Sequence, residues 1–402
     1  MYLTLVILAA FVFFYSITAG RVEKMPISGP IIFVVFGLLV GPSGFGLLDL
    51  HIHSEELSVL AELTLALVLF TDAAGSNFVI LKNSLHIPLR LLLIGLPLTL
   101  LLGYLAGTFV LPDLPLLELA LLATMLAPTD AALGKAVVSN ESVPPRIRTG
   151  LNVESGLNDG ICVPVLFVFL ALVVGTEADG GPFSLAFTLV VEELGIGALV
   201  GIGCTAFGTW IAHYCNKQGW ITKTWSQLPL VALAMTCFAL AQLLHGSGFI
   251  ACFIGGMLFG AIEKTHKERL LVDAEGIGDT LALITWVVFG AVVVGPTLHA
   301  FSWEVVCYAI LSLTVVRMLP VFLCLAGTGL SVAEKLFIGW FGPRGLASIV
   351  FAIIVLSEEK VIHGKLLALI VACTVILSVL GHGFSANPLA NRLGKNIKPE
   401  KS

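Results

Sequence analysis

Charged residues are scarce in this sequence: 12% of its 402 residues are Asp, Glu, Lys or Arg, whereas soluble domains carry about 25%. Hydrophobic residues make up 57% of the chain, which excludes a water-soluble globular protein. The net charge is only −5, and no cluster of basic residues with interleaved aromatics occurs, so we expect no nucleic-acid partner. Because one membrane span takes about 20 apolar residues, the chain has room for about a dozen spans.

Three other patterns are also missing. The eight cysteines show no Cys-x-x-Cys spacing and mostly lie in apolar runs, so we expect neither a metal site nor a disulfide framework. The alternating ten-residue pattern of an outer-membrane β-barrel is absent, which favours a bundle of helices. The first apolar run has no basic residues before it and exceeds the length of a signal-peptide core, so it is predicted to be the first span.

The apolar segments predict an all-α polytopic membrane protein with about 13 transmembrane helices. They cover residues 2–20, 26–42, 57–75, 87–111, 116–138, 150–175, 185–212, 226–244, 247–262, 278–296, 303–326, 334–356 and 364–385. Of the 21 Lys and Arg residues, 17 lie at or near connections after odd-numbered segments or in the C-terminal tail, and only Lys360 and Lys365 follow an even-numbered one. The positive-inside rule therefore predicts an external N-terminus and a cytoplasmic C-terminus.

Two of these segments are interrupted. The fifth contains Ala127-Pro128-Thr129-Asp130, and the twelfth contains Phe341-Gly342-Pro343-Arg344-Gly345. A break at membrane depth leaves backbone groups that need polar surroundings. Since the two breaks are seven segments apart, segments 1–6 and 8–13 can form two repeats of opposite orientation around segment 7, the pattern of many transporters.

Six ionisable side chains lie inside apolar segments, where each costs about 2.5 to 3.5 kcal/mol to insert at the centre of a span. They are Asp72, Asp130, Glu154, Asp159, Arg317 and Arg344. At a rise of about 1.5 Å per residue, Asp159 lies roughly 14 Å from the inner end of its segment, which is near the bilayer midplane. Four acids and two arginines leave this set at −2, so a proton or a cation is needed there.

The sixth segment, in LNVESGLNDG, carries two polar faces. Glu154 and Asn158 are spaced i, i+4, and Ser155 and Asp159 form the neighbouring face. The hydroxyl and carboxylate of Ser155 and Asp159 are hard oxygen ligands for a small cation. We expect Asp72 and the unwound backbone at Thr129 to complete that shell, while Glu154 looks like a structural anion that needs an arginine.

These motifs resemble the CPA1-type monovalent cation:proton antiporters, the NhaP-like and NHE-like sodium/proton exchangers. LNVESGLNDG is similar to their Glu-Ser-x-x-Asn-Asp signature, APTDAALG to their unwound Thr-Asp segment, and FGPRG to their Gly-x-Arg-Gly break; the resemblance covers about 380 residues. It implies the NhaA-like antiporter fold, with two inverted six-helix repeats and crossed, unwound helices 5 and 12. It also implies a transporter and not an enzyme, with no cofactor besides the transported sodium or other monovalent cation and the proton.

The resemblance assigns roles to the polar residues. Asp159 would carry the proton and bind the cation, with Asn158 beside it. Asp72, Ser155 and the Thr129 carbonyl would coordinate the cation. Glu154 would pair with Arg317, and Asp130 and Arg344 are expected to compensate charge at the breaks. Because related exchangers with an amide at the position of Asn158 look electroneutral, we expect alternating-access exchange of one cation for one proton, with competition at Asp159.

The same resemblance predicts the organisation of the chain. Residues 1–385 would form the transmembrane antiporter domain, divided into repeat 1 (about 1–175), a linking helix (about 185–212) and repeat 2 (about 226–385). Residues 386–402 would form a short cytoplasmic tail in place of the large cytosolic domain of many relatives. We expect a homodimer in the cell (inner) membrane, in contact with lipid and acting in sodium and pH homeostasis.

Several alternatives remain open. The sequence does not distinguish sodium, lithium and potassium, so a potassium/proton antiporter of the same fold is the nearest alternative. A cation channel would need a symmetric, glycine-rich carbonyl filter, and none is present. An intramembrane aspartyl protease could use Asp130 and Asp159, but the Gly-x-Gly-Asp context is missing and Arg317 and Arg344 would have no role.

Overall fold

The regular secondary structure of this computed structural model is helical throughout the residues that it describes, which are 2–22, 28–48, 54–75, 86–138, 140–176, 182–222, 224–263 and 267–396. The beginning of the predicted segment 26–42 and the end of the predicted tail lie outside them. The chain divides into two compact units. Unit 1 comprises Met1–His53, Ser84–Asn158 and Leu283–Ser402, and unit 2 comprises Ser54–Asn83 and Asp159–Ala282.

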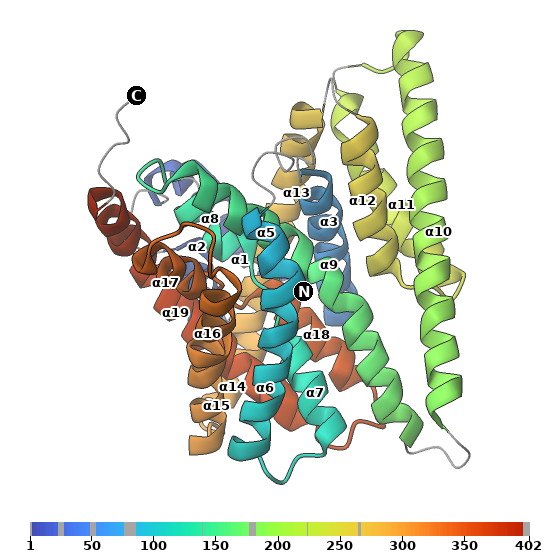
Figure 1. Cartoon of the computed structure of the whole chain (residues 1–402). Coiled ribbons are helices and arrows are strands. Elements are labelled where there is room, and N and C mark those ends of the chain that lie inside the picture. The colour runs from blue at the N-terminus through green and yellow to red at the C-terminus, as the bar shows by residue number, and fades with distance from the viewer. Residues whose placement is uncertain are drawn as a thin grey trace. The chain divides into compact units, whose positions relative to one another are not determined.

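Unit 1 holds most of the helices (Figure 1). They are α1 (Tyr2–Val22), α2 (Gly29–Val40), α5 (His86–Arg90), the π-helical turn η1 (Leu91–Gly95), α6 (Leu96–Val110), α7 (Leu116–Met125), α8 (Ala131–Val138), the first part of α9 (Pro145–Thr176), the end of α13 (Lys267–Val288), the π-helical turn η3 (Phe289–Val294), α14 (Gly295–Thr297), α15 (Trp303–Leu313), α16 (Val315–Cys324), α17 (Val332–Trp340), α18 (Leu346–Ser357) and α19 (Gly364–Asn396).

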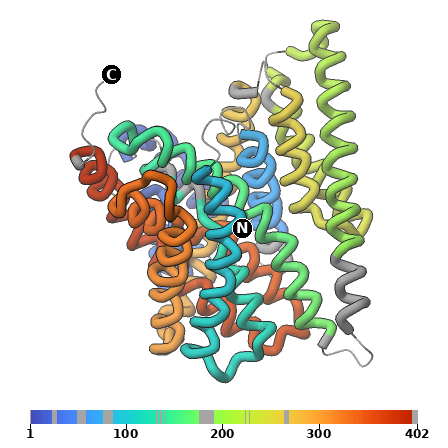
Figure 2. Tube along the Cα trace, viewed as in Figure 1, coloured from blue at the N-terminus to red at the C-terminus, as the bar shows by residue number. Residues whose placement is uncertain are grey.

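Unit 2 is a smaller bundle in which the long α10 runs beside α11 and α12 (Figure 1). Its helices are α3 (Ser54–Gly75), the second part of α9, α10 (Pro182–Lys217), the 3₁₀ turn η2 (Trp225–Gln227), α11 (Pro229–Leu243), α12 (Gly248–Ile262) and most of α13. Helix α9, traced in Figure 2, runs without interruption from Pro145 to Thr176 and contributes to both units.

Within the described residues, each predicted apolar segment overlaps one helix or two or three consecutive helical elements. Seven helices of the described chain are long and apolar enough to cross a membrane, and five shorter apolar helices have 10–17 residues. Two of those, α7 and α18, belong to the interrupted segments. The helices also expose large apolar side chains, among them Phe13 (60%), Phe109 (85%) and Trp210 (65%). Surfaces of this kind suit lipid, because hydrocarbon tails solvate apolar side chains and leave the backbone bonded within each helix.

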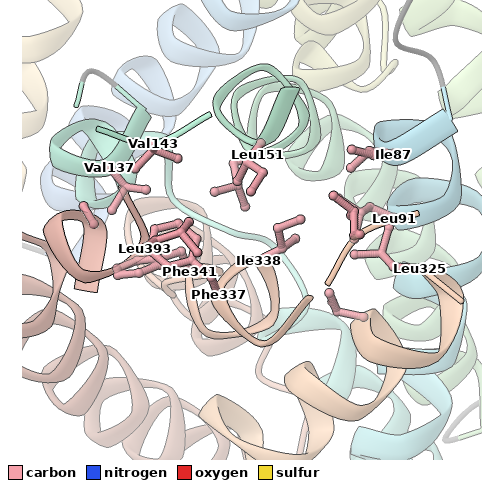
Figure 3. Close-up of a cluster of buried hydrophobic side chains, with 14 of the residues drawn as sticks. Ile87, Leu91, Val137, Val143, Leu151, Leu325, Phe337, Ile338, Phe341 and Leu393 are labelled. Carbon is pink, nitrogen blue, oxygen red and sulfur yellow. The ribbon is translucent and has the colours of Figure 1, made fainter. Parts of the chain in front are cut away.

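A cluster of buried aliphatic and aromatic side chains packs within unit 1 and includes Phe341 of the second interrupted segment (Figure 3). Leu151 of α9 and Val137 of α8 meet Phe337, Ile338 and Phe341 of the α17 region there. The cluster also includes Leu393, so α19 is packed and helical well beyond the predicted end of its segment at residue 385. This packing gives the short helices α8 and α17 the rigid support that their length alone would not provide.

Backbones approach closely where glycines face another helix. In unit 1, Gly37 of α2 lies against the carbonyl of Val287, and Gly41 lies against Ala291 of η3. In unit 2, Gly256 of α12 lies against the carbonyl of Phe70 of α3 in the same way. Such small-residue contacts are typical of helices that pack within a membrane.

Candidate functional site

The first break separates α7 from α8 at Leu126–Asp130, where the chain leaves the helical conformation. Thr129 is only 2% exposed, and its polar groups bond to α9. The Ser155 hydroxyl donates to the Thr129 carbonyl at 2.5 Å, and the Asn158 amide donates to the Thr129 hydroxyl at 2.5 Å. The Thr129 N–H in turn donates to the Asn158 Oδ1 at 3.3 Å. Helix α9 therefore provides hydrogen-bond partners for the N–H and the carbonyl of Thr129.

The second break separates α17 from α18 at residues 341–345 and lies against the first. The Asp130 N–H donates to the Pro343 carbonyl at 2.8 Å, so the two unwound segments are hydrogen-bonded to each other. Gly345 is needed at this contact, because a Cβ atom on it would overlap the carboxylate of Asp130. The sequence motifs that predicted the two breaks thus meet at one place in unit 1.

The charged side chain of each break also forms hydrogen bonds with the other break. Asp130 accepts from the Leu133 N–H at the start of α8 (2.9 Å) and from the Leu346 N–H at the start of α18 (2.7 Å). Arg344, which is completely buried, donates through Nη1 to the carbonyls of Ala127 (2.9 Å) and Pro128 (3.1 Å) beyond the end of α7. An anion at helix N-termini and a cation at a helix C-terminus both oppose the helix dipole, so each charge is stabilised where it lies.

A buried ion pair joins α9 to α16. Arg317 Nη1 lies 2.6 Å from Glu154 Oε1, and Arg317 Nη2 donates to Glu154 Oε2 at 2.8 Å, so the contact is bidentate. Both residues are at most 2% exposed. The Arg317 guanidinium also packs directly on the backbone of the second break, where a Cβ on Gly342 would collide with it. The pair expected from the resemblance is therefore formed, and its arginine lies against the second break.

The partners of the polar residues on α9 differ from the division that helical spacing suggested. We expected Glu154 and Asn158 to share one face and Ser155 and Asp159 another. In the structure Ser155 and Asn158 share a partner, Thr129, while Glu154 bonds to Arg317. Residues three apart lie as close together as residues four apart on a helix, and the position of the Thr129 backbone decides which pair is used.

The remaining two expected ligands belong to unit 2. Asp159 is 8% exposed and follows Asn158 directly on α9, at the point where that helix passes into unit 2. Asp72 is half-buried in α3. Both carboxylates are engaged in interactions within the described chain.

A small cavity opens beside the breaks, within unit 1. It holds about 20 Å³, enough for one water-sized sphere, and its polar lining comes from Thr129, Asp130, Asn152 and Ser155. A wider hollow of about 330 Å³ shares Val138 and Asn152 with it and is lined further by Arg148 and Thr149. The Thr129–Ser155 pair therefore faces a space of the size of one small dehydrated ion or one water molecule.

Several buried polar residues escaped the sequence analysis. Ser378 and His382 of α19 bond to the second break, Glu118 pairs with His363 (2.9 Å), and Glu334 pairs with Arg146 (2.6 Å). Ser378 and His382 could have been found as polar residues spaced i, i+4 in an apolar segment. In the part of the chain that the structure describes, no three His, Cys, Asp or Glu side chains gather as metal ligands.

Residues 7–392 match the family described as "Sodium/hydrogen exchanger, transmembrane". The chain is 24% identical to the K(+)/H(+) antiporter NhaP of Alkalimonas amylolytica over 399 residues, covering 96% of this chain and 66% of that protein. It is 29% identical over 307 residues to the Na(+)/H(+) antiporter NhaH of Halobacillus dabanensis, covering 72% of each. It spans slightly less than two thirds of the K(+)/H(+) antiporters, 63% in the case of NhaP2 of Shewanella sp. (strain ANA-3).

The fold is similar to that of the sodium proton antiporter MjNhaP1 from Methanocaldococcus jannaschii at pH 8, with a TM-score of 0.79 and 21% identity over 99% of both chains. The family match covers nearly the whole chain, and the helices, breaks and buried charges fit the fold that it predicts. The chain therefore belongs to the sodium/hydrogen exchanger family and is a multi-pass membrane protein with an antiporter fold.

Proposed function

We propose that this protein exchanges a monovalent cation, sodium and also lithium, for a proton by alternating access. One observation carries the proposal: two broken helices exchange the charges of Asp130 and Arg344 beside the helix that presents Ser155, Asn158 and Asp159. That arrangement brings uncharged oxygen groups and a carboxylate together on one side of two broken helices. It serves a transported ion, because a broken helix offers carbonyls to a cation while its charges stay compensated.

Asp159 is proposed as the group that binds either the cation or the proton. The Thr129 carbonyl, the Ser155 hydroxyl and Asp72 would supply further oxygen ligands, which suit a hard monovalent cation. Because the Ser155 hydroxyl donates to the Thr129 carbonyl in this state, its proton would turn away when both oxygens face a cation. The two breaks are proposed to be held in place by two acids and two arginines whose charges cancel: Asp130, Glu154, Arg317 and Arg344.

The stoichiometry follows from Asn158. An amide does not titrate near neutral pH, and its two polar atoms are both used by Thr129. Asp159 is then the principal proton carrier of the site, and one cation replaces one proton. The exchange would be electroneutral and competitive: as the pH falls, Asp159 becomes protonated and the apparent affinity for the cation decreases.

The finer architecture is part of the same proposal. About 13 spans would cross the membrane, with repeats of opposite orientation containing the breaks between α7 and α8 and between α17 and α18. The N-terminus would face outward and the C-terminus the cytoplasm, as the distribution of Lys and Arg favours. A homodimer in the cell (inner) membrane is proposed from the family resemblance.

Flux into proteoliposomes tests the function directly. Purified protein would be reconstituted with a pH-sensitive dye inside, and a sodium gradient should move protons. Asp159→Ala should reduce this flux to that of empty liposomes while the protein still folds, because replacing a buried carboxylate by a methyl group removes a desolvation cost. The matched control is Asp113→Ala, which removes an exposed acid between α6 and α7 and should transport normally. Sodium-driven flux through Asp159→Ala would contradict the assignment of the carrier.

Potassium/proton antiport is the second candidate, and two of the relatives reported above are named K(+)/H(+) antiporters. Separate titrations of the same proteoliposomes with sodium, lithium and potassium decide between the two. Half-saturation by sodium and lithium well below that by potassium supports the main proposal, and the reverse order supports the alternative.

A further inference from the structure

The second break leaves buried backbone groups that must find partners. Helix α17 ends at Trp340 and α18 begins at Leu346, and the side chains of Phe341, Arg344 and Leu346 are between 0 and 6% exposed. Buried N–H and C=O groups are almost always hydrogen-bonded, and more strictly so at membrane depth. Asp130 takes the Leu346 N–H and the Pro343 carbonyl. Two other groups at the break are the Trp340 carbonyl, which accepts from the Gly342 N–H at 2.9 Å and can accept a second hydrogen bond, and the Arg344 N–H.

Helix α19 bonds to both of these groups. The Arg344 N–H donates to the Ser378 hydroxyl oxygen at 2.7 Å, and His382 Nε2 lies 2.8 Å from the Trp340 carbonyl. Ser378 and His382 are spaced i, i+4, so they lie on one face of α19, and they are 0% and 1% exposed. One face of one helix therefore bonds to both ends of the break.

The two side chains are also bonded to each other. His382 Nδ1 lies 3.2 Å from the Ser378 hydroxyl oxygen and 2.9 Å from the Ser378 carbonyl. The Trp340 and Ser378 carbonyls both only accept, so a neutral imidazole donates to one of them; with the proton on Nε2, it donates to the Trp340 carbonyl. Since the Ser378 oxygen accepts from Arg344, its own proton can be donated to Nδ1. A neutral imidazole thus completes a chain that runs from the Arg344 N–H through Ser378 and His382 to the Trp340 carbonyl.

Packing fixes the imidazole in this position. Its ring lies on the Trp340 indole, with 4.9 Å between ring centroids and 31° between planes, and 6.3 Å from the Phe341 ring. The indole N–H donates to the Ser385 hydroxyl at 2.8 Å, one further contact from α19. Ser385 bonds to a side chain only, whereas Ser378 bonds to the backbone of the break.

We infer that His382 and Ser378 are positioning residues that hold the α17–α18 break open and so fix Arg344 against the α7–α8 break. Arg344 connects the two, because its N–H is held by Ser378 while its guanidinium reaches the carbonyls of Ala127 and Pro128. Those carbonyls precede Thr129, whose carbonyl is a proposed cation ligand. We call Ser378 and His382 the clamp. The effect of the clamp on transport rests on the proposed function, whereas its contacts with the break do not.

Hydrogen exchange tests the clamp independently of transport. Four variants of the full chain are compared with the wild type: Ser378→Ala, His382→Leu, His382→Gln and Ser385→Ala. Peptides that cover 341–346 should exchange about fivefold faster in Ser378→Ala and in His382→Leu, the ratio expected for the loss of one net hydrogen bond. His382→Gln keeps an N–H near the position of Nε2 and should restore much of the protection. Ser385→Ala should exchange like the wild type.

Transport kinetics test the consequence. In Ser378→Ala and His382→Leu the half-saturating cation concentration should rise several-fold and the maximal rate should fall, whereas Ser385→Ala should change neither. A merely structural role would instead lower the melting temperature of the Ser378 and Ser385 variants alike and leave half-saturation unchanged in the folded fraction. Ser378→Ala is the smaller change and carries the test if His382→Leu does not fold.

Unchanged exchange of the 341–346 peptides in both Ser378→Ala and His382→Leu would overturn the clamp. Faster exchange with unchanged half-saturation would overturn its role in positioning. Absence of cation-dependent proton flux in the wild type would instead reject the proposed function, and the exchange data would still decide whether the clamp exists.

Discussion

The two helix breaks are alike in backbone and different in their neighbours. Each break is hydrogen-bonded to a polar pair on one adjacent helix: Ser155 and Asn158 of α9 at the first, Ser378 and His382 of α19 at the second. The α9 pair is followed by a buried carboxylate, Asp159, and borders a cavity, whereas the described part of α19 has no acid inside its apolar stretch. The same solution to a backbone problem thus serves a proposed ion site at one break and a scaffold at the other.

The comparison also explains why Asp130 and Arg344 each bond to the break to which they do not belong. If each break kept its own charge, the Asp130 carboxylate would lose the N-terminus of α18, and Arg344 would lose the carbonyls beyond α7. Exchanging them ties the breaks together and leaves α9 free to present its polar groups toward the cavity.

The largest effect is expected at the buried ion pair that joins α9 to α16 beside the second break. Arg317→Ala or Glu154→Ala leaves an unpaired charge in a buried place and should destabilise the protein by about 3 to 5 kcal/mol. The exchange of the two residues, Glu154→Arg with Arg317→Glu, should recover part of this loss because the bidentate contact can form again. Thermal unfolding in detergent measures both. Equal melting temperatures for the wild type and the single variants would show that the pair contributes nothing.

A smaller loss is expected for the exchanged charges. Arg344→Leu removes the donor to the carbonyls of Ala127 and Pro128 and should cost about 2 to 3 kcal/mol. Here exchanging the residues, Asp130→Arg with Arg344→Asp, should recover nothing, because each charge would then face the helix end of its own sign. The same unfolding assay distinguishes this from the Glu154–Arg317 pair; recovery on exchange would mean that the helix ends are not what holds these charges.

Asn158→Asp tests whether the first break differs from the second in having a single proton-carrying carboxylate beside it. It removes one donor to Thr129 and should cost about 1 kcal/mol of stability. On the proposed mechanism it adds a titrating carboxylate, so exchange that is equal at 0 and about −100 mV in the wild type should become voltage-dependent, since one charge is worth about 2.3 kcal/mol per 100 mV. Potassium with valinomycin sets the potential, and a second ionophore controls for potassium transport. Voltage dependence in the wild type would contradict one-for-one exchange.

The smallest effect is expected at a pair away from both breaks. Arg146 contacts Glu334 at 2.6 Å, but its side chain is 50% exposed. Arg146→Ala should therefore cost at most about 1 kcal/mol, and less at high salt, because water screens the pair. Melting temperatures at low and high salt check this. A loss as large as that of Arg317→Ala would show that burial does not set the order of these effects.

Much of the fold was predictable because long apolar runs and their interruptions follow directly from bilayer thickness. Pro128 and Pro343 marked both breaks, and five of the six predicted deep charges are at most 8% exposed, Asp72 being half-buried. The π-helical turns at Leu91–Gly95 and Phe289–Val294 and the interruption at Thr314 were not predicted. Both π-helical turns are accompanied by a glycine and a proline, Gly95 with Pro97 and Gly295 with Pro296, and such residues also occur in helices without a π turn. Tertiary packing also carries α19 to Asn396, through Pro388.

The charges of the site and one pair, Glu154 with Arg317, were predictable, whereas its other partners were not. An acid or arginine in an apolar segment stands out through its insertion cost, whereas Ser378 and His382 give a weaker signal, two polar residues spaced i, i+4 in an apolar segment. Glu118 and Glu334 are 2% and 3% exposed but lie at the beginning of helices, where a sequence cannot separate a solvated acid from a buried one. Which residue of α9 bonds to Thr129 depended on distances between elements far apart in the chain.

The contact of α2 with η3 should be about equally stable in a lipid bilayer and in a detergent micelle. Gly37 and Gly41 bring one backbone onto another, so this contact depends on van der Waals attraction and weak Cα–H···O contacts between surfaces that fit. It does not depend on hiding apolar area from water, because hydrocarbon surrounds the helices whether or not they touch. A detergent micelle offers the same hydrocarbon, so transfer from bilayer to micelle changes little in the free energy of this contact. Shape, and not the medium, keeps these two helices together.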